Sequence, residues 1–114
     1  MDQRNKADVG KMNPLLLFKD LYGPLQSVLA VLSYGAEKYT PQGWRTVETE
    51  RYQAALLRHI NSWLAGESRD PETGLHHLSH AVTNCLFLLW FEMQGKPLMA
   101  YTTYAPPPQD HKRG

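Results

Sequence analysis

The stretch PETGLHHLSHAVTNCLFLLWFEMQG (residues 71–95) decides the fold class of this chain. Its apolar residues recur at steps of three and four, and Gly95, with a proline two residues later, is typical of a helix end. The pattern predicts a long helix that starts near Pro71 or Gly74 and ends at Gly95. Over residues 86–91 this helix is apolar on almost every side, which predicts that neighbouring elements or a subunit interface cover it.

A second helix is predicted over residues 24–39. Pro24 suits a first helical position, and the stretch TPQG at residues 40–43 has the chemistry of a turn. A short extra helix is expected over residues 15–18, where four apolar residues follow one another.

A third helix is predicted over residues 49–66. Thr49 or Thr46 is its expected N-cap, and Gly66 lies where a helix end favours a left-handed residue. No sustained period-two alternation, the mark of a strand, interrupts these helical patterns. The chain is therefore predicted to be all-α, a small antiparallel helical bundle.

Three medium helices make a thin bundle, in which a helix that is apolar on all sides is poorly covered. We therefore expect oligomerisation to complete the bundle as a dimer or a dimer of dimers. The alternative is that residues 15–17 and 101–104 fold over it. The expected organisation is a polar N-terminal segment (residues 1–13), a single all-α catalytic domain (residues 14–100) and a Pro-rich C-terminal tail (residues 101–114).

Composition excludes several classes of protein. The chain has 114 residues, and 12 Lys and Arg against 11 Asp and Glu give a net charge of +1, which disfavours electrostatic binding to nucleic acid. A single cysteine, Cys85, fits a reducing cytoplasm, and its bulky apolar neighbours predict a buried thiol. The longest apolar run is too short to cross a bilayer, and residues 1–10 lack a signal-peptide core. We expect a cytoplasmic protein with no membrane and no nucleic-acid partner.

Residues that could carry chemistry concentrate in one part of the chain: Arg58, His59, Glu67, Asp70, Glu72, His76, His77, His80 and Asn84. Helical spacing puts His59 and Glu67 on one face of their helix, and His77, His80 and Asn84 on one face of the next. If these helices pack antiparallel, the two polar faces meet near Glu67 and Asp70.

Such a meeting would suit a divalent ion. Glu67 and Asp70 offer oxygen ligands for Mg²⁺ or Mn²⁺, while His77 and His80 could bind an ion, donate to phosphate or transfer protons near neutral pH. Asn84 could orient a water or a histidine. Solvated charges and surface histidines would give the same spacing, so the residues alone leave the choice open. Zinc-finger, P-loop, Rossmann and His-Asp phosphohydrolase motifs are all missing.

A second polar group surrounds the turn at residues 40–43. Lys38 and Arg45 could bind phosphates, and Trp44 or Tyr39 could stack on a base. A turn closed by a buried tryptophan explains the same residues, and we prefer that interpretation on spacing alone. Lys11, which follows a glycine, is equally ambiguous.

These segments resemble the small phage and bacterial dATP/dGTP diphosphohydrolases, relatives of the MazG-like all-α nucleoside triphosphate pyrophosphohydrolases. The matching pieces are Gly35-Ala36-Glu37-Lys38-Tyr39, Trp44, Arg58-His59, Gly66-Glu67-Ser68-Arg69-Asp70 and His77-Leu78-Ser79-His80-Ala81-Val82-Thr83-Asn84. The resemblance covers roughly residues 8–92. Gly43 stands where the family usually has Asn, and two acids of the better-known MazG-like metal site are replaced here by histidines.

The resemblance implies a Mg²⁺- or Mn²⁺-dependent hydrolysis of a deoxypurine triphosphate, dGTP or dATP, to the monophosphate and pyrophosphate, which adjusts the deoxynucleotide pool of a phage or cell. The metal ligands expected from it are Glu67, Asp70, His77, His80 and Glu37, with Glu72 another possible replacement. The expected catalytic residues are Glu67 and His80. The expected substrate-binding residues are Lys11, Lys38, Trp44, Arg45, Arg58, His59 and Asn84.

Two other classes of function fit the same residues less well. One is a non-catalytic helical interaction module, in which the histidine cluster is structural or binds a regulatory metal. The other is a small single-stranded nucleic-acid binder that uses aromatic residues near the turn for stacking, which the near-neutral charge argues against.

Overall fold

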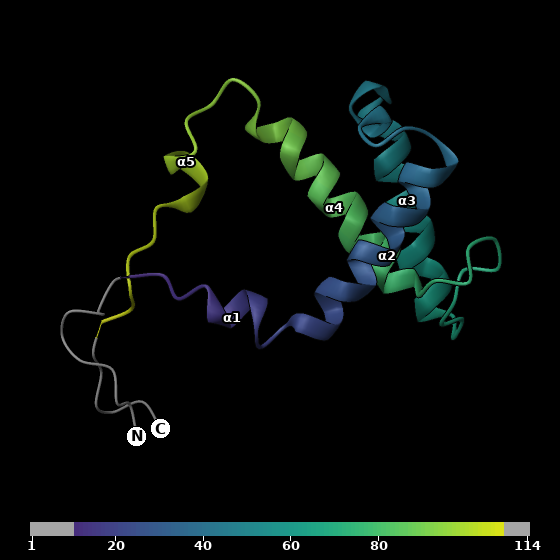
Figure 1. Cartoon of the computed structure of the whole chain (residues 1–114), viewed down its shortest axis with the longest axis horizontal. Coiled ribbons are helices and arrows are strands. Elements are labelled where there is room, and N and C mark those ends of the chain that lie inside the picture. Colours follow the sequence, from purple (N-terminus) through teal and green to yellow (C-terminus); the bar gives the residue numbers. More distant parts are fainter. Residues whose placement is uncertain (1–10, 109–114) are drawn as a thin grey trace.

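The computed structural model describes residues 11–108, and within that range it contains helices and no strand (Figure 1). The elements in chain order are α1 (Leu15–Phe18), α2 (Tyr22–Lys38), the 3₁₀ helix η2 (Gly43–Thr46), α3 (Thr49–Leu64), α4 (His77–Met93) and α5 (Met99–Thr102). The predicted all-α fold and the short helix at residues 15–18 are confirmed.

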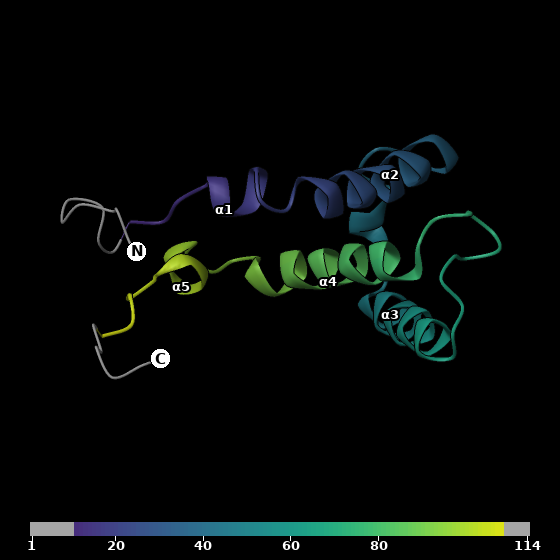
Figure 2. The same cartoon turned by 90° about the horizontal axis from the view of Figure 1, so that it is seen from below.

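Helix α4 is the centre of the bundle and lies between α2 and α3 (Figure 2). Tyr52, early in α3, contacts Phe91 near the end of α4, whereas His59, later in α3, contacts His77 at the start of α4. The two helices therefore run antiparallel, as the sequence predicted. Helix α2 packs on α4 beside its first turns, where the hydroxyl of Ser79 donates to that of Ser27 at 2.9 Å.

The helix starts differ from the sequence predictions in three places, and α2, α3 and α4 end at Lys38, Leu64 and Met93, one or two residues before the predicted ends at 39, 66 and 95. Helix α2 begins two residues before Pro24, which is tolerated because the first-turn N–H groups of a helix have no intrahelical partner. The N-cap of α3 is Glu48, without a side-chain hydrogen bond, so the prediction of a threonine cap is wrong. The hydroxyl of Thr46 instead donates to the carbonyl of Gly43 inside η2.

The start of α4 is also later than predicted. The helix begins at His77, and the imidazole Nδ1 of His76 caps it by accepting from the N–H of Leu78 at 3.0 Å. The preceding loop at residues 65–76 opens at Gly66, whose φ of 101° is left-handed as expected. The carboxylate of Asp70 accepts from the N–H of Thr73, and this bond holds the segment in a loop rather than a helical turn.

An aromatic cluster fills the far end of the α3–α4 pair. Trp44, carried by η2, stacks on Phe87 with ring centroids 4.4 Å apart and meets Trp90 edge-on at 4.9 Å. The hydroxyl of Tyr52 donates to the carbonyl of Trp44 at 2.7 Å and fixes the turn against α3. Trp44 is therefore half-buried and packs over the turn, as the interpretation preferred from spacing predicts.

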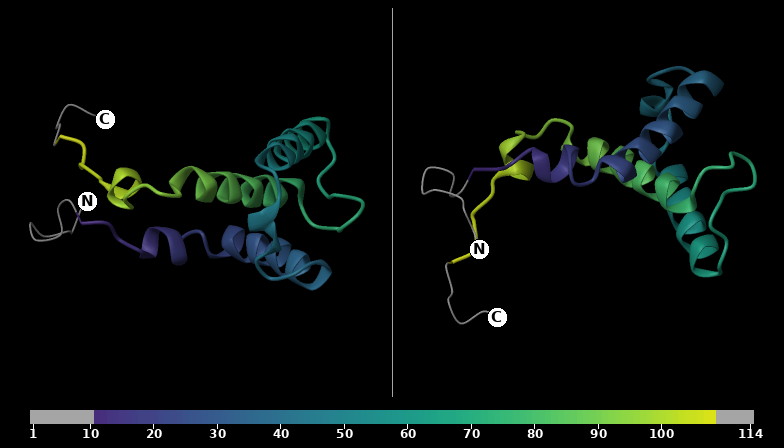
Figure 3. Two further views of the ribbon diagram at one scale, coloured as in Figure 1. Left: turned by 90° about the horizontal axis from the view of Figure 1, so that it is seen from above. Right: turned by 60° about the horizontal axis from the view of Figure 1, so that its bottom comes forward.

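The apolar core of the described chain is small. Among residues 11–108, the only buried apolar side chains are Val28 and Ala81. The other buried residues of α4 are polar: His77, Ser79, Thr83 and Asn84. Helices α1 and α5 lie outside the α2–α3–α4 bundle, at one end of it (Figure 3), and leave its apolar faces open.

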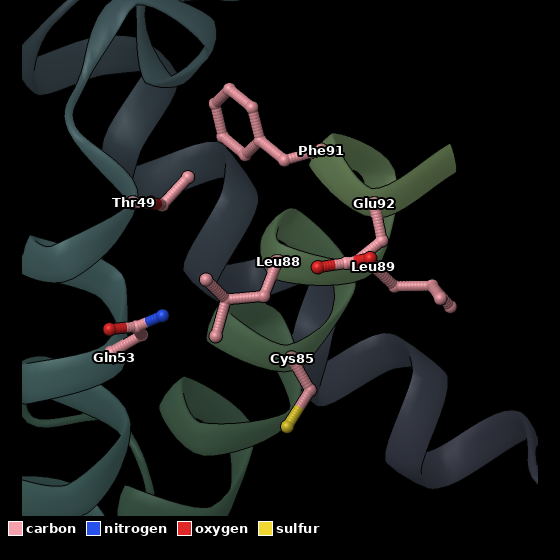
Figure 4. Close-up of a pocket in the computed structure, with 7 residues that line it drawn as sticks. All are labelled: Thr49, Gln53, Cys85, Leu88, Leu89, Phe91 and Glu92. Carbon is pink, nitrogen blue, oxygen red and sulfur yellow. The ribbon is translucent and has the colours of Figure 1, made fainter. Parts of the chain in front are cut away.

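Cys85 is exposed, so the prediction of a buried thiol is wrong. It lines an open cavity of about 410 Å³ between α3 and α4, together with Thr49, Gln53, Leu88, Leu89, Phe91 and Glu92 (Figure 4). Among the described residues, no helix is both long enough and apolar enough to span a bilayer.

Candidate functional site: a histidine–carboxylate cluster

Three histidines and two carboxylates converge where α3 and α4 meet the loop between them. His59 comes from α3, His77 and His80 come from the first turn of α4, and Glu67 and Asp70 come from the loop. The loop folds back on itself, because the N–H of His77 donates to the carbonyl of Ser68 at 2.9 Å. The two polar faces therefore meet at the end of the bundle that helical spacing indicated.

One hydrogen-bonded chain runs through the most buried member, His77, which is 2% exposed. Its Nε2 lies 2.6 Å from Oε1 of Glu67, and its Nδ1 lies 2.8 Å from Nδ1 of His59. Because an ionised carboxylate only accepts, Nε2 of His77 carries the proton, and in a neutral His77 the Nδ1 atom is left with a free lone pair. That lone pair accepts from the Nδ1–H of His59.

A second chain runs through Asp70 and His80. Oδ2 of Asp70 accepts from both the N–H and the hydroxyl of Thr73, each at 3.0 Å. Because the hydroxyl of Thr73 donates its hydrogen to Asp70, its oxygen accepts from Nε2–H of His80 at 2.7 Å. The ring of His80 stacks on that of His59, with centroids 4.5 Å apart and planes at 5°, which joins the two chains.

The cluster favours neutral imidazoles beside an ionised carboxylate. Burial lowers the pKa of His59 and His80 below 6.5, because the interior disfavours the imidazolium form, and His80 lowers the pKa of His59 further. For Asp70, burial alone would raise the pKa, but the two hydrogen bonds from Thr73, together with the nearby imidazoles of His80 and His59, outweigh it and the pKa is lowered. At neutral pH His59 and His80 therefore each keep one nitrogen lone pair and Asp70 is ionised, the protonation states that metal ligands need.

The donor set fits a divalent ion. His59, Asp70 and His77 each offer one ligand atom, and these atoms all lie within 4.8 Å of one another. Two nitrogens and one oxygen from three separate elements, arranged around a half-buried point, form a chelating group of the kind that binds transition-metal ions.

Asn84, predicted to bind substrate, is buried, and its amide donates to the carbonyl of His80 at 2.9 Å within α4. Lys38 reaches the loop from α2 and pairs with Glu72 at 3.0 Å, and the hydrogen bond that its ammonium donates to Glu72 raises the pKa of Lys38. Glu37 is exposed on α2, and its carboxylate makes no ion pair within residues 11–108.

Of the remaining predicted substrate residues, Trp44 and Arg45 lie apart from the cluster. Trp44 packs on Phe87, seven residues beyond His80 and about 10 Å further along α4. The guanidinium of Arg45 lies over the Trp44 ring at 5.3 Å. Arg58 is exposed on α3, and Lys11 is exposed at the start of the described residues.

Sequence reasoning missed Thr73, which links Asp70 to His80. The available signal was the spacing Asp-x-x-Thr before a helix, in which an aspartate accepts from an N–H three residues on. It also missed the capping role of His76, whose side chain takes the place of the usual Ser, Thr or Asp.

The fold and the cluster define an all-α protein with a polar centre suited to a divalent ion. Residues 1–100 match the family described as "dATP/dGTP diphosphohydrolase, N-terminal", and the chain belongs to this family. A relative from Salmonella phage PMBT28, named "dATP/dGTP diphosphohydrolase", is 35% identical over 85 residues. The match covers 75% of this chain but 28% of that relative, so the chain spans less than a third of its length. No solved structure matches the chain significantly.

Proposed function

We propose that this chain is a metal-dependent nucleoside triphosphate diphosphohydrolase, which converts dGTP, dATP or both to the monophosphate and pyrophosphate. The observation that carries the proposal is the convergence of His59 and His77 with the carboxylate of Asp70, in a member of this family. The name of the phage relative supports a deoxypurine triphosphate as substrate. The chain would act on the deoxynucleotides of the cytoplasm. If a phage encodes it, this is the cytoplasm of the bacterial host.

The reaction adds water across the anhydride between the α and β phosphates. Water attacks phosphorus, the bond to the bridging oxygen breaks, pyrophosphate leaves, and one proton of the water goes to a base. A bound Mg²⁺ or Mn²⁺ would supply charge neutralisation at the phosphates and lower the pKa of the water. The candidate base is Glu67, whose side chain is 49% exposed while its Oε1 stays on His77. His80, whose lowered pKa leaves a lone pair on its ring, is the second candidate to accept and move that proton.

Cationic side chains must balance the charge that develops on the leaving pyrophosphate. Lys38 is the best placed, because it reaches the loop that carries Asp70 and its partner Glu72 is exposed. A phosphate can replace Glu72 as the partner of Lys38. Arg58 lies next to His59 on α3 and is free to reach a substrate from the solvent side.

Product analysis tests the function directly. The purified chain is incubated with Mn²⁺ or Mg²⁺ and with dGTP, dATP, dCTP or dTTP, and nucleotides are separated by ion-exchange chromatography. We expect monophosphate and pyrophosphate from one or both purines. Diphosphate and phosphate would overturn the cleavage position, and no turnover with any nucleotide would favour a non-catalytic interaction module.

We further infer that the chain works as a homo-oligomer, with a second copy covering α4. Val82, Leu86 and Leu89 are each 46% exposed and follow one another at steps of four and three, so they form one apolar stripe on α4. With so small a buried core in the single chain, a stripe of this kind needs a helical partner of matching apolar character. A dimer or a dimer of dimers supplies it.

Leu86→Glu should therefore shift the chain from oligomer to monomer or reduce its stability, because it places a charge in the middle of the stripe. Light scattering coupled to size-exclusion chromatography measures the mass. The control is Asn61→Glu, which adds the same charge at an exposed polar position of α3 and should leave the mass unchanged. A wild-type protein that is monomeric at all concentrations would contradict the inference.

A further inference from the structure

We infer that the ion of this site is bound by nitrogen atoms of His59 and His77 together with a carboxylate oxygen of Asp70, and that Glu67 positions His77 rather than binding the ion. The inference rests on the metal dependence in the proposed function and deepens it. It moves His59 from the substrate-binding residues to the metal ligands. It also names the class of ion, a divalent transition metal such as Mn²⁺ in preference to Mg²⁺.

The spacing of the two imidazoles supports this donor set. Their Nδ1 atoms are 2.8 Å apart. Two neighbouring ligands of an octahedral ion, with metal–nitrogen bonds of about 2.1 Å at right angles, lie about 3.0 Å apart. The two nitrogens therefore already lie at nearly the separation that an ion requires. If His59 takes the other tautomer, with its proton on Nε2 instead of Nδ1, both Nδ1 lone pairs become available.

The contact of Glu67 explains why Nδ1 of His77 is the coordinating atom. Oε1 of Glu67 accepts from Nε2 of His77 at 2.6 Å, which fixes the tautomer and aims the free lone pair at His59. Carboxylates that hold the far nitrogen of a metal-binding histidine in this way orient the ring and raise its basicity. This arrangement gives Glu67 a positioning role.

Asp70 is held in a similar way. Both hydrogen bonds from Thr73 use Oδ2, and within residues 11–108 Oδ1 of Asp70 accepts none. His80 completes the support, because its Nε2 is engaged by Thr73 and its ring lies flat against that of His59. In this arrangement His80 fixes the plane of the His59 ring and the position of the Asp70 loop.

A set of two imidazoles and one carboxylate selects among ions. Mg²⁺ prefers oxygen ligands and keeps several waters, whereas a site with nitrogen ligands favours first-row transition-metal ions, and its affinity for them rises from Mn²⁺ to Co²⁺. We therefore expect Mn²⁺ and Co²⁺ to bind the protein without nucleotide more tightly than Mg²⁺ does.

The test uses Co²⁺ alone as the probe, read by visible absorption and by calorimetric titration of the full chain. The wild type should bind one Co²⁺ per chain and give ligand-field bands. His59→Ala should weaken binding at least about 100-fold, and Glu67→Gln should weaken it about 10- to 100-fold with unchanged bands, because the donor set is retained. The matched control is His76→Asn, which removes a nearby imidazole yet keeps a good N-cap for α4.

Circular dichroism shows whether each variant is folded, and His59→Gln replaces His59→Ala if the alanine variant is not. Wild-type Co²⁺ affinity in a folded His59 variant, or no Co²⁺ binding by the wild type, would overturn the inference. The outcome is separate from that of the proposed function. Co²⁺ binding through His59 without nucleotide hydrolysis would keep this donor set and remove the enzyme, and turnover in a folded His59 variant would do the opposite.

Discussion

Asp70→Asn should lower the rate of deoxypurine triphosphate hydrolysis by about 1,000-fold or more while leaving the fold intact. The asparagine keeps an oxygen that accepts from the N–H of Thr73, so the loop retains the bond that shapes it. What it removes is the negative charge, and with it the anionic ligand beside the two imidazoles. Steady-state kinetics at fixed Mn²⁺ measure the loss.

The kinetic pattern distinguishes a ligand from a structural residue. A lost ligand lowers kcat, and part of the activity should return at high Mn²⁺ concentration, whereas a loosened fold would not respond to the ion. Glu50→Gln is the matched control, since it removes an exposed carboxylate at the start of α3 and should change the rate less than twofold. Equal activity in the two variants would show that another acid, such as Glu37, supplies the anionic ligand.

The helices of this protein could be predicted because their apolar residues repeat with a helical period over many residues. Local side-chain chemistry then sets where α4 begins. The apolar pattern predicts that α4 begins within residues 71–76. In the structure Asp70 instead accepts from the N–H of Thr73, His76 is the N-cap, and α4 begins at His77. Periodicity does not report such competition, because it depends on single hydrogen bonds.

The meeting of His59 with His77 and His80 could also be predicted, because helical spacing places each on a defined face and the antiparallel pairing brings the faces together. Which atoms of these side chains face each other could not be predicted from the sequence. That Glu67 binds Nε2 of His77, and so leaves Nδ1 for His59, depends on the path of the loop after Gly66. The exposure of Cys85 could not be predicted from the sequence either, because it depends on which elements pack over α4.

Trp44→Ala should lower the free energy of unfolding by about 3 kcal/mol, the lower end of the range for truncating a large aromatic residue, because Trp44 is half-buried. It removes the stack on Phe87 and the edge contacts with Trp90 and Phe91. Against a domain stability of about 5–15 kcal/mol, such a loss is large. Trp44→Phe keeps an aromatic ring and should lose about 1 kcal/mol. Urea denaturation followed by circular dichroism measures both.

The same two variants decide between the two roles considered for Trp44. If it only closes the turn, folded Trp44→Phe at low temperature should have the KM of the wild type for dGTP or dATP, because the histidine–carboxylate cluster lies about 10 Å away along α4. If a second copy brings Trp44 to the site as a stacking surface for the purine, KM should rise while stability changes little. A higher KM in the folded variant would therefore contradict a purely structural role and would place the aromatic cluster at a shared active site.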